Sequence, residues 1–220
     1  MNRKLDSTAV MQRRVEPKDS LDDFPTPPWA TRALLEFLDD AAWIEGTDVI
    51  REPAANRGYM VRPLAERFDT VYPSDIADYG AGYPVVDYLT SENEPIVDWT
   101  ITNPPFSLAK DFILKALGHS RLGVAMILRI AFLEGKGRYE ELFRPLPPSY
   151  VLQFVERVPM VKGAYDPSAS SATAYAWFVW TKEAPEGLRL GRTPTELHWI
   201  PPCKDELFRQ GDDFLLDKRV

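Results

Sequence analysis

The sequence predicts a single α/β domain built on a mostly parallel sheet. The chain has 220 residues and 45% hydrophobic content, which suits one full core better than two. Short apolar runs alternate along it with runs at helical spacing. The run 48–51 passes through a loop of small residues into a helical pattern, which is typical of the first crossover of a nucleotide-binding sheet.

Composition argues against several classes of function. The formal charge of −7 and the pI near 5.0 disfavour a protein that coats nucleic acid, and give no polybasic membrane face. With one cysteine, Cys203, and two scattered histidines, we expect neither a disulfide framework nor a metal site. No apolar run approaches the roughly 18 residues of a membrane span, and the start lacks a signal-peptide core, so we expect a cytoplasmic protein.

The first segment, residues 1–21, has mixed charge and little periodicity, and we expect a flexible tail before one domain over 22–220. A nucleic-acid-contacting arm is the alternative. Thr26 is expected to cap a helix with Pro27 in its first turn. The inward face of this helix would carry Trp29, Ala33, Leu34, Phe37 and Leu38. The free N–H groups at a helix start suit a carboxylate.

Two strand candidates follow, at 48–51 and 70–75. The first leads into a loop from Glu52 to Gly58, and then into a helix with Met60, Val61, Leu64, Ala65 and Phe68. Within the loop, Asn56 can support a turn, because asparagine tolerates φ > 0 better than most residues. Asp75 follows Glu52 by about 20 residues, the spacing at which a second-strand acid meets ribose hydroxyls. The alternative is an aspartate that caps a turn.

A third strand candidate, 96–102, runs into the tetrad Asn103, Pro104, Pro105 and Phe106. The prolines fix φ and remove backbone donors, so the Asn103 side-chain oxygen and the Pro104 carbonyl are expected to point the same way as acceptors. Two such acceptors suit an exocyclic amino group, and an aromatic face suits a planar base. The alternative is an ordinary Asn-Pro turn in a chain with 20 prolines.

The remaining pattern predicts one helix and several strands. Ser107 is expected to cap a helix that ends at Gly118, and its apolar face would carry Leu108, Phe112, Ile113, Ala116 and Leu117. Strands are expected at 123–128, 150–154 and 174–180, with a polar loop over 129–138 and an edge segment at 197–202. The last two strands fit a hairpin, and the core is expected to receive Trp177, Phe178 and Trp180.

The tetrad resembles the catalytic motif of S-adenosylmethionine-dependent amino-methyltransferases, most of all compact phage-type DNA N6-adenine methyltransferases. The resemblance covers roughly 24–182. It implies a Rossmann-like class I methyltransferase sheet, mostly parallel with an antiparallel edge hairpin and helices on both faces. It also implies S-adenosyl-L-methionine as cofactor and direct methyl transfer to adenine N6 in DNA. The catalytic residues would be Asn103, Pro104, Pro105 and Phe106.

The same resemblance implies the other site residues. Cofactor contacts are expected at Phe24, Thr26, Pro27, Glu52, Pro53, Ala54, Asn56, Gly58, Asp75, Ile76, Asp87 and Tyr88. The loop departs from the usual pattern at Asn56, and Arg57 would be bulky beside a cofactor. Substrate contacts are expected at Arg129, Phe132, Lys136 and Arg138, although nearby glutamates make an ordinary solvated helix surface an alternative.

Several substrates remain open at this point. An RNA base, cytosine N4 and a protein glutamine all offer an amino group to the same tetrad, and a non-catalytic nucleic-acid-binding relative is a further alternative. DNA is the expected partner. The chain has no insertion long enough for a separate recognition domain, so specificity is expected from loops, a protein partner or an oligomer.

Overall fold

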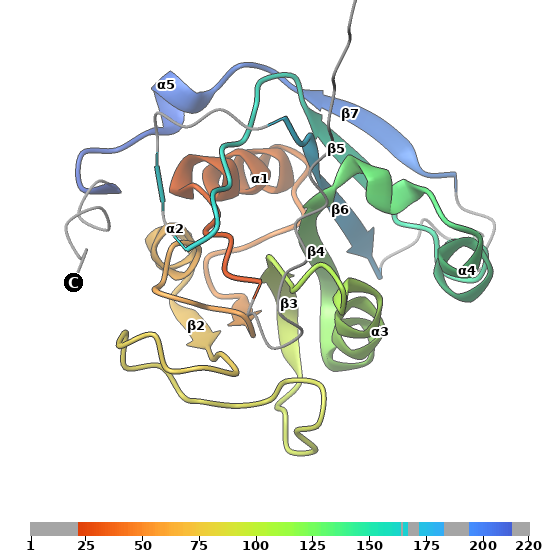
Figure 1. Cartoon of the computed structure of the whole chain (residues 1–220), viewed down its shortest axis with the longest axis horizontal. Coiled ribbons are helices and arrows are strands. Elements are labelled where there is room, and N and C mark those ends of the chain that lie inside the picture. Colours follow the sequence, from red (N-terminus) through yellow and green to blue (C-terminus); the bar gives the residue numbers. More distant parts are fainter. Residues whose placement is uncertain (1–21, 164, 167–171, 183–193, 213–220) are drawn as a thin grey trace, which may run out of the picture.

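The computed structural model describes residues 22–163, 165–166, 172–182 and 194–212 (Figure 1). The expected tail, 1–21, lies outside the described residues. The described part forms one seven-stranded sheet in the order β2-β1-β3-β4-β6-β5-β7. Its strands are β1 Val49–Glu52, β2 Thr70–Pro73, β3 Val97–Thr102, β4 Ser120–Arg129, β5 Tyr150–Phe154, β6 Tyr175–Thr181 and β7 Glu196–Ile200.

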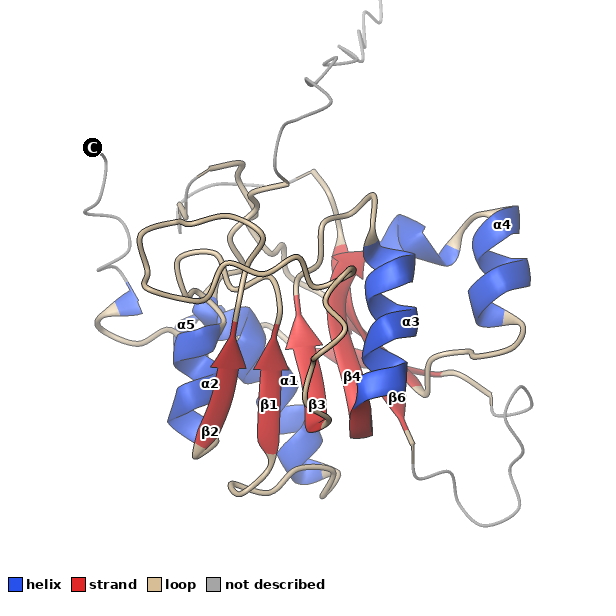
Figure 2. Cartoon of the chain, turned by 90° about the horizontal axis from the view of Figure 1, so that it is seen from below, coloured by secondary structure: helices blue, strands red, loops and turns tan. Residues whose placement is uncertain are grey.

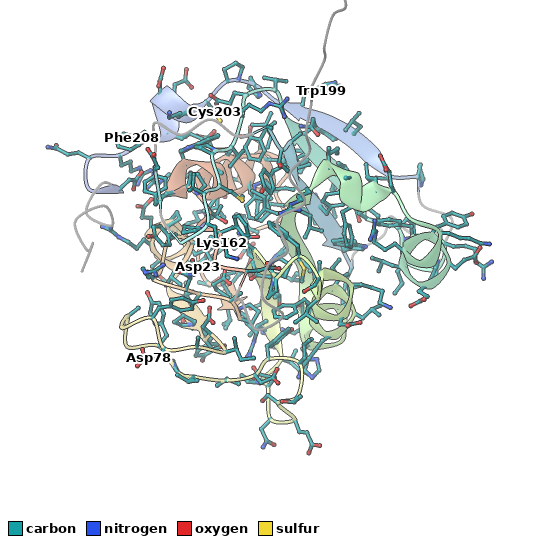
Figure 3. All side chains as sticks on the ribbon, viewed as in Figure 1. Asp23, Asp78, Lys162, Trp199, Cys203 and Phe208 are labelled. Carbon is teal, nitrogen blue, oxygen red and sulfur yellow. The ribbon has the colours of Figure 1, made fainter. Side chains whose placement is uncertain are left out.

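The sheet is parallel except for one strand. β2, β1, β3 and β4 run parallel, whereas β6 is antiparallel to both β4 and β5. The expected hairpin of the last two predicted strands is therefore confirmed, as is the mostly parallel sheet. The edge itself is formed by β7, which pairs parallel with β5. On β7, Trp199 is 64% exposed at the periphery of the molecule (Figure 3).

Helices cover both faces of the sheet, as expected (Figure 2). α1 (Pro28–Asp40) and α2 (Val61–Arg67) lie on one face, and α3 (Ala109–His119) lies on the other. Two buried clusters result. The first joins α1 and α2 to the sheet through Trp29, Leu34, Leu64, Ile101 and Trp177. The second joins α3 to the opposite face through Phe112, Ile113, Met126 and Phe178.

Close packing in the sheet depends on a glycine. Trp99 of β3 is fully buried, and a Cβ at Gly123 of β4 would lie 2.3 Å from its ring. Only glycine therefore lets the indole lie across β4. The aromatic residues of β6 are also buried, at 0% exposure for Trp177 and Phe178 and 4% for Trp180, which confirms their prediction as core.

The expected helix caps are not formed. α1 begins at Pro28 with Pro27 as its N-cap, and Thr26 makes no capping hydrogen bond. α3 begins at Ala109 with Leu108 as N-cap, so Ser107 does not cap it either, and the helix ends one residue past Gly118. In α1, Pro28 occupies the first helical position, where its fixed φ and missing N–H are best tolerated.

The segment after β4 is more ordered than the polar loop that we expected. It forms a 3₁₀ turn over Ile130–Leu133, the short helix α4 at Lys136–Arg138 and a π-helical turn over Tyr139–Phe143. The last short helix, α5, spans Lys204–Leu207. Across the described ranges, every helix is too short or too polar to cross a membrane.

A buried ion pair ties a surface loop to the first strand. Arg51 of β1 is 3% exposed and pairs with Glu94, whose side chain is 7% exposed. The Arg51 guanidinium also donates to the carbonyl of Pro95 at 3.2 Å. Because the loop from 87 to 95 contributes to the cavity described next, this pair helps to fix one of its walls.

Candidate active site

The loops after β1, β2 and β3 gather at the carboxyl ends of these strands (Figure 2). Residues of these loops line a cavity of about 330 Å³. Ligand sites of α/β sheets form at this edge, and their volumes start at roughly 300 Å³. The structure brings most of the sequence-predicted residues together there. The cavity lining includes Phe24, Thr26, Pro53, Ala54, Asn56, Asp75, Ile76, Asp87, Tyr88, Asn103 and Pro105. Pro27, Glu52, Gly58, Pro104 and Phe106 are not among the lining residues.

Glu52 ends β1 beneath this lining and is 0% exposed. Its Oε1 accepts hydrogen bonds from the Ala54 N–H at 2.9 Å and from the Thr102 hydroxyl at 2.6 Å. Burial raises the pKa of Glu52 to about 8, although both hydrogen bonds act to lower it. Its Oε2 is buried without a hydrogen-bond partner among the described residues. This environment keeps the Glu52 carboxyl protonated, and therefore neutral, at neutral pH.

The loop after Glu52 turns through two residues with positive φ, Asn56 at 50° and Gly58 at 89°. Asn56 thus adopts the conformation for which its side chain was expected to be suited. The φ of 89° at Gly58 is one that residues with a side chain rarely adopt, and a Cβ there would also lie 2.4 Å from the Tyr83 hydroxyl, so this position favours glycine. Arg57, which we expected to be bulky beside a ligand, instead pairs with Asp23 at 3.2 Å and leaves the cavity lining clear.

Asp75, at the end of β2, is 7% exposed and faces the cavity. Its Oδ2 accepts from the Asn56 N–H at 2.9 Å, and its Oδ1 accepts from the Ala77 N–H at 3.1 Å. Burial raises its pKa, while these backbone hydrogen bonds lower it. Each oxygen retains a lone pair for a ligand hydroxyl. Beside it, the side chain of Ile76 is 54% exposed and offers an apolar surface to a planar group.

The next wall of the cavity comes from the loop before β3. Asp87 accepts from the Leu89 N–H at 3.0 Å and lines the cavity. Tyr88 is 2% exposed, and its ring lies 5.1 Å from that of Phe112 on α3. Burial raises the pKa of Tyr88 to about 12, so its hydroxyl stays protonated at neutral pH.

Asn103 follows directly after β3, and its amide is oriented by the backbone. Its Nδ2 donates to the carbonyl of Phe24 at 2.8 Å and contacts the Met160 sulfur at 4.0 Å. The donor end of the amide is therefore occupied, which leaves Oδ1 as an acceptor beside the cavity. This orientation agrees with the acceptor role that the sequence predicts for Asn103.

Phe106 forms an aromatic group with two other rings. Its ring centroid lies 5.3 Å from that of Phe24 and 6.1 Å from that of Tyr175. The guanidinium of Arg129, at the end of β4, lies 4.1 Å from the Phe106 centroid. A cation at this distance from an aromatic face is attracted by the ring quadrupole. Arg129 thus lies next to the tetrad, although it does not line the cavity.

The other expected substrate contacts are not gathered at the cavity. The Phe132 ring packs instead against Phe143 at 5.8 Å and Phe178 at 5.7 Å, in the second core cluster. The Arg138 guanidinium lies 5.0 Å from the centroid of the Phe132 ring, and its Nε donates to the Phe132 carbonyl at 2.9 Å. Arg138 therefore stabilises the local turn that contains Phe132. Lys136 is exposed on α4. The packing of Phe132 does not support its expected place in a base pocket.

Residues 22–24 form a strap beside the cavity, in which the sequence predicts a site role for Phe24 but not for Asp22 or Asp23. The Asp22 Oδ2 accepts from the Phe106 N–H at 2.9 Å. Asp23 accepts from the Asn56 Nδ2 at 2.7 Å, and its carbonyl accepts from the Gly163 N–H at 2.7 Å. Asp23 and Lys162, the neighbour of Gly163, lie in the middle of the view in Figure 3. The strap therefore joins the loop after β1, the tetrad and the loop after β5.

Two other lining residues that the sequence did not predict are aromatic. Tyr59 and Tyr79 both contribute to the cavity wall. Burial raises the pKa of Tyr79 to about 12, with the charges of Asp75 and Asp23 acting in the same direction. The only available signal in the sequence was their place in loops that follow predicted strands, which does not distinguish them from other loop residues.

The polar atoms of the cavity fit a small ligand with a charged, hydroxyl-bearing and planar part. The Thr26 hydroxyl belongs to the lining, is buried and has no hydrogen-bond partner among the described residues. Buried polar groups are normally paired, so an orphan beside a cavity indicates a ligand contact. Within the described ranges, no group of three or more His, Cys, Asp or Glu residues is arranged to hold a metal ion.

Comparison with known proteins supports the fold. No protein-family model matches the chain, and no curated protein matches its sequence. A proposed RNA methyltransferase from Pyrococcus horikoshii matches in structure with a TM-score of 0.60 and 19% identity, over 77% of this chain and 91% of that one. A proposed class I S-adenosylmethionine-dependent methyltransferase from Listeria monocytogenes matches with a TM-score of 0.58 and 11% identity, over 80% of this chain and 65% of that one.

The M protein of the type I restriction enzyme EcoKI matches with a TM-score of 0.60 and 13% identity. That match covers 83% of this chain and 50% of the M protein, so this chain spans about half of its length. At such low identities, the shared feature is the arrangement of strands and helices. The chain therefore has the Rossmann-like fold of class I S-adenosylmethionine-dependent methyltransferases.

Proposed function

We propose that this chain transfers a methyl group from S-adenosyl-L-methionine to an exocyclic amino group, namely N6 of adenine in DNA. The observation that carries this proposal is the orientation of Asn103. Its Nδ2 is held by the Phe24 carbonyl at 2.8 Å, so its Oδ1 is available as an acceptor beside the cavity. The cavity lies at the strand ends where the fold places nucleotide ligands.

The residues around the cavity would hold the cofactor in three parts. Asp75 would accept the ribose hydroxyls, and Ile76, Asp87 and Tyr88 would contact the adenine ring. Thr26 and the loop from Pro53 to Gly58 would hold the methionine part, where the orphan Thr26 hydroxyl provides a polar partner. When bound, the cofactor supplies an electrophilic methyl group on a sulfonium.

The tetrad would position the acceptor amine. Asn103 Oδ1 and the Pro104 carbonyl would accept the two amine hydrogens, which turns the nitrogen lone pair toward the methyl group. The rings of Phe106 and Phe24, whose centroids lie 5.3 Å apart, would provide the aromatic contact for the base. Rate enhancement would come from orientation and from acceptors that are already in place.

DNA adenine is the substrate that we propose among several candidates. Its support is the pair Phe24 and Phe106, and the fold shared with the modification subunit of a type I restriction enzyme. Because the chain spans about half of that subunit, we propose that a partner or oligomer supplies sequence specificity. Phage-type identity and a cytoplasmic location belong to the same proposal.

An RNA base is the second candidate. It is favoured by the match to the Pyrococcus horikoshii protein, of which this chain covers 91%. Arg129 beside Phe106 would serve either nucleic acid, because both carry phosphates. The test below therefore includes both polymers.

The test measures methyl transfer from labelled S-adenosyl-L-methionine to unmethylated DNA, to RNA and to total protein. Any labelled nucleic acid is digested and its nucleosides are analysed by mass. We expect N6-methyladenine from DNA. Label in RNA or protein would show that the substrate is RNA or protein instead of DNA. Absence of both methyl transfer and cofactor binding would refute the proposal.

The variant Asn103→Ala tests the residue that carries the proposal. We expect loss of transfer, by a factor of about 10² or more, with cofactor affinity largely kept. Asn93→Ala makes the same substitution at an exposed loop position outside the cavity lining and should leave activity unchanged. Full activity of Asn103→Ala would contradict the assignment.

A further inference from the structure

We propose that Asp22 is a further catalytic residue, whose carboxylate stabilises the positive charge on the target amine and accepts its proton. This inference rests on the proposed amino-methyl transfer and concerns the same site. It goes beyond the tetrad, because Asp22 lies far from it in sequence and reaches it only through the fold.

The position of Asp22 is set by hydrogen bonds. Its Oδ2 accepts from the backbone N–H of Phe106 at 2.9 Å, although the two residues are 84 positions apart. Its carbonyl accepts from the Phe24 N–H at 3.0 Å. The carbonyl of Phe24 in turn accepts from the Asn103 amide at 2.8 Å. Asp22 therefore lines the cavity together with Asn103 and Pro105.

The chemistry of the tetrad lacks a group of this kind. The Asn103 amide and the Pro104 carbonyl accept hydrogen bonds, but neither carries a negative charge or holds a proton at neutral pH. Methyl transfer moves a positive charge from the donor sulfur to the target nitrogen. A carboxylate beside that nitrogen is therefore favoured more strongly in the transition state than before it, which is the condition for a catalytic effect.

The step is balanced without any further reactant. The lone pair of the target nitrogen forms the new N–C bond while the electron pair of the donor S–C bond returns to sulfur. One of the two protons of the now cationic amine leaves its contact with Asn103 Oδ1 or the Pro104 carbonyl and passes to Asp22 Oδ1, which accepts no hydrogen bond from the other described residues. The proton then passes to water.

The other carboxylates near the cavity have different surroundings. Asp75 binds backbone N–H groups through both oxygens at the end of β2. Asp87 accepts from the Leu89 N–H in the loop before β3. Glu52 lies beneath the lining, and Asp23 pairs with Arg57. Among the lining residues, Asp22 is thus the carboxylate that binds the tetrad itself.

The first test compares Asp22→Asn with the wild type in single-turnover methyl transfer. Asparagine keeps an oxygen that can accept from the Phe106 N–H, so the strap should remain, but the charge and the proton acceptor are lost. We expect the rate of the chemical step to fall by about 10²- to 10⁴-fold, the usual contribution of a positioned acid or base. The matched control is Asp40→Asn, which removes an exposed carboxylate at the end of α1 and should keep the wild-type rate.

The second test measures binding rather than activity. Sinefungin carries a protonated amine where S-adenosylmethionine carries its methyl group, whereas S-adenosylhomocysteine is neutral there. The quantity compared is the ratio of the dissociation constant for S-adenosylhomocysteine to that for sinefungin. We expect this ratio to be at least about threefold smaller in Asp22→Asn than in the wild type, because a charge-assisted hydrogen bond is removed. An unchanged preference together with a wild-type rate would overturn the role of Asp22.

Two further outcomes separate this inference from the proposed function. If wild type transfers methyl groups and Asn103→Ala does not, the function stands, and the rate and ligand preference of Asp22→Asn decide the role of Asp22. If Asp22→Asn fails to fold, the variant Asp22→Glu, which keeps the negative charge, is tested in its place. A rate for Asp22→Glu within about tenfold of wild type supports the role, and a fall of more than 10²-fold with intact ligand binding overturns it.

Discussion

The buried acid Glu52 leads to a prediction for the pH dependence of stability, tested with the variant Glu52→Gln. Glu52 is 0% exposed, and burial raises its pKa from the ordinary 4.5 to about 8. Glutamine has nearly the same shape, and its carbonyl can accept the hydrogen bonds from Ala54 and Thr102 that Oε1 accepts now. Unlike glutamate, glutamine does not ionise, so the variant lacks the titratable group at position 52 while the rest of the site stays similar.

The sign follows from the proton count of each state. Below about pH 4.5 both states hold the proton, and the stability contribution of neutral Glu52 is fully present. Between 4.5 and about 8 the unfolded chain loses the proton and the folded chain keeps it, so the free energy of unfolding falls as pH rises. The slope is about 1.4 kcal/mol per pH unit, and the whole difference between the two pKa values corresponds to about 5 kcal/mol.

The assay is chemical denaturation of wild type and Glu52→Gln at several pH values. Between pH values of about 5.5 and about 7.5, the wild type should lose roughly 3 kcal/mol relative to the variant. Groups common to both proteins cancel in this difference. Glu92→Gln, which removes an exposed carboxylate, serves as the matched control and should run parallel to wild type. Parallel curves for Glu52→Gln as well would refute the reasoning.

Two more predictions concern the loops around the cavity. Gly58→Ala places a Cβ 2.4 Å from the Tyr83 hydroxyl at φ 89°, so we expect at least about 1 kcal/mol of lost stability and weaker cofactor binding, measured by denaturation and equilibrium titration. An unchanged midpoint and affinity would contradict this. Arg51→Ala leaves Glu94 buried without its ion-pair partner, so we expect a loss of about 3–5 kcal/mol, whereas Arg51→Met combined with Glu94→Leu should lose much less. Equal losses in both proteins would be inconsistent with a penalty from the unpaired charge.

The parts of the fold that local sequence controls could be predicted. Apolar runs that end in polar residues predicted the strands β2 and β3. Asp75 and Asn103 follow the ends of these strands, which is why both could be predicted to lie at the cavity. The tolerance of asparagine for positive φ predicted the turn at Asn56, which has φ 50°. In each case the cause lies within a few residues of the effect.

Features set by contacts distant in sequence could not be predicted in this way. Asp22 reaches Phe106 across 84 positions, and nothing in its neighbours marks it as a site residue. Phe132 stands at a strand end, where ligand contacts are common, but its 3₁₀ turn places the ring against Phe178. For Thr26, a local preference for capping was overridden, because the helix begins at Pro28 instead.

The strap over 22–24 also determines how two distant amides exchange their hydrogens with solvent. The Phe106 N–H donates to the Asp22 side chain, and the Gly163 N–H donates to the carbonyl of Asp23. An amide held in this way exchanges only when its hydrogen bond opens. Because the two acceptors belong to consecutive residues, one detachment of the strap exposes both amides. We therefore expect the two amides to exchange together when the strap detaches.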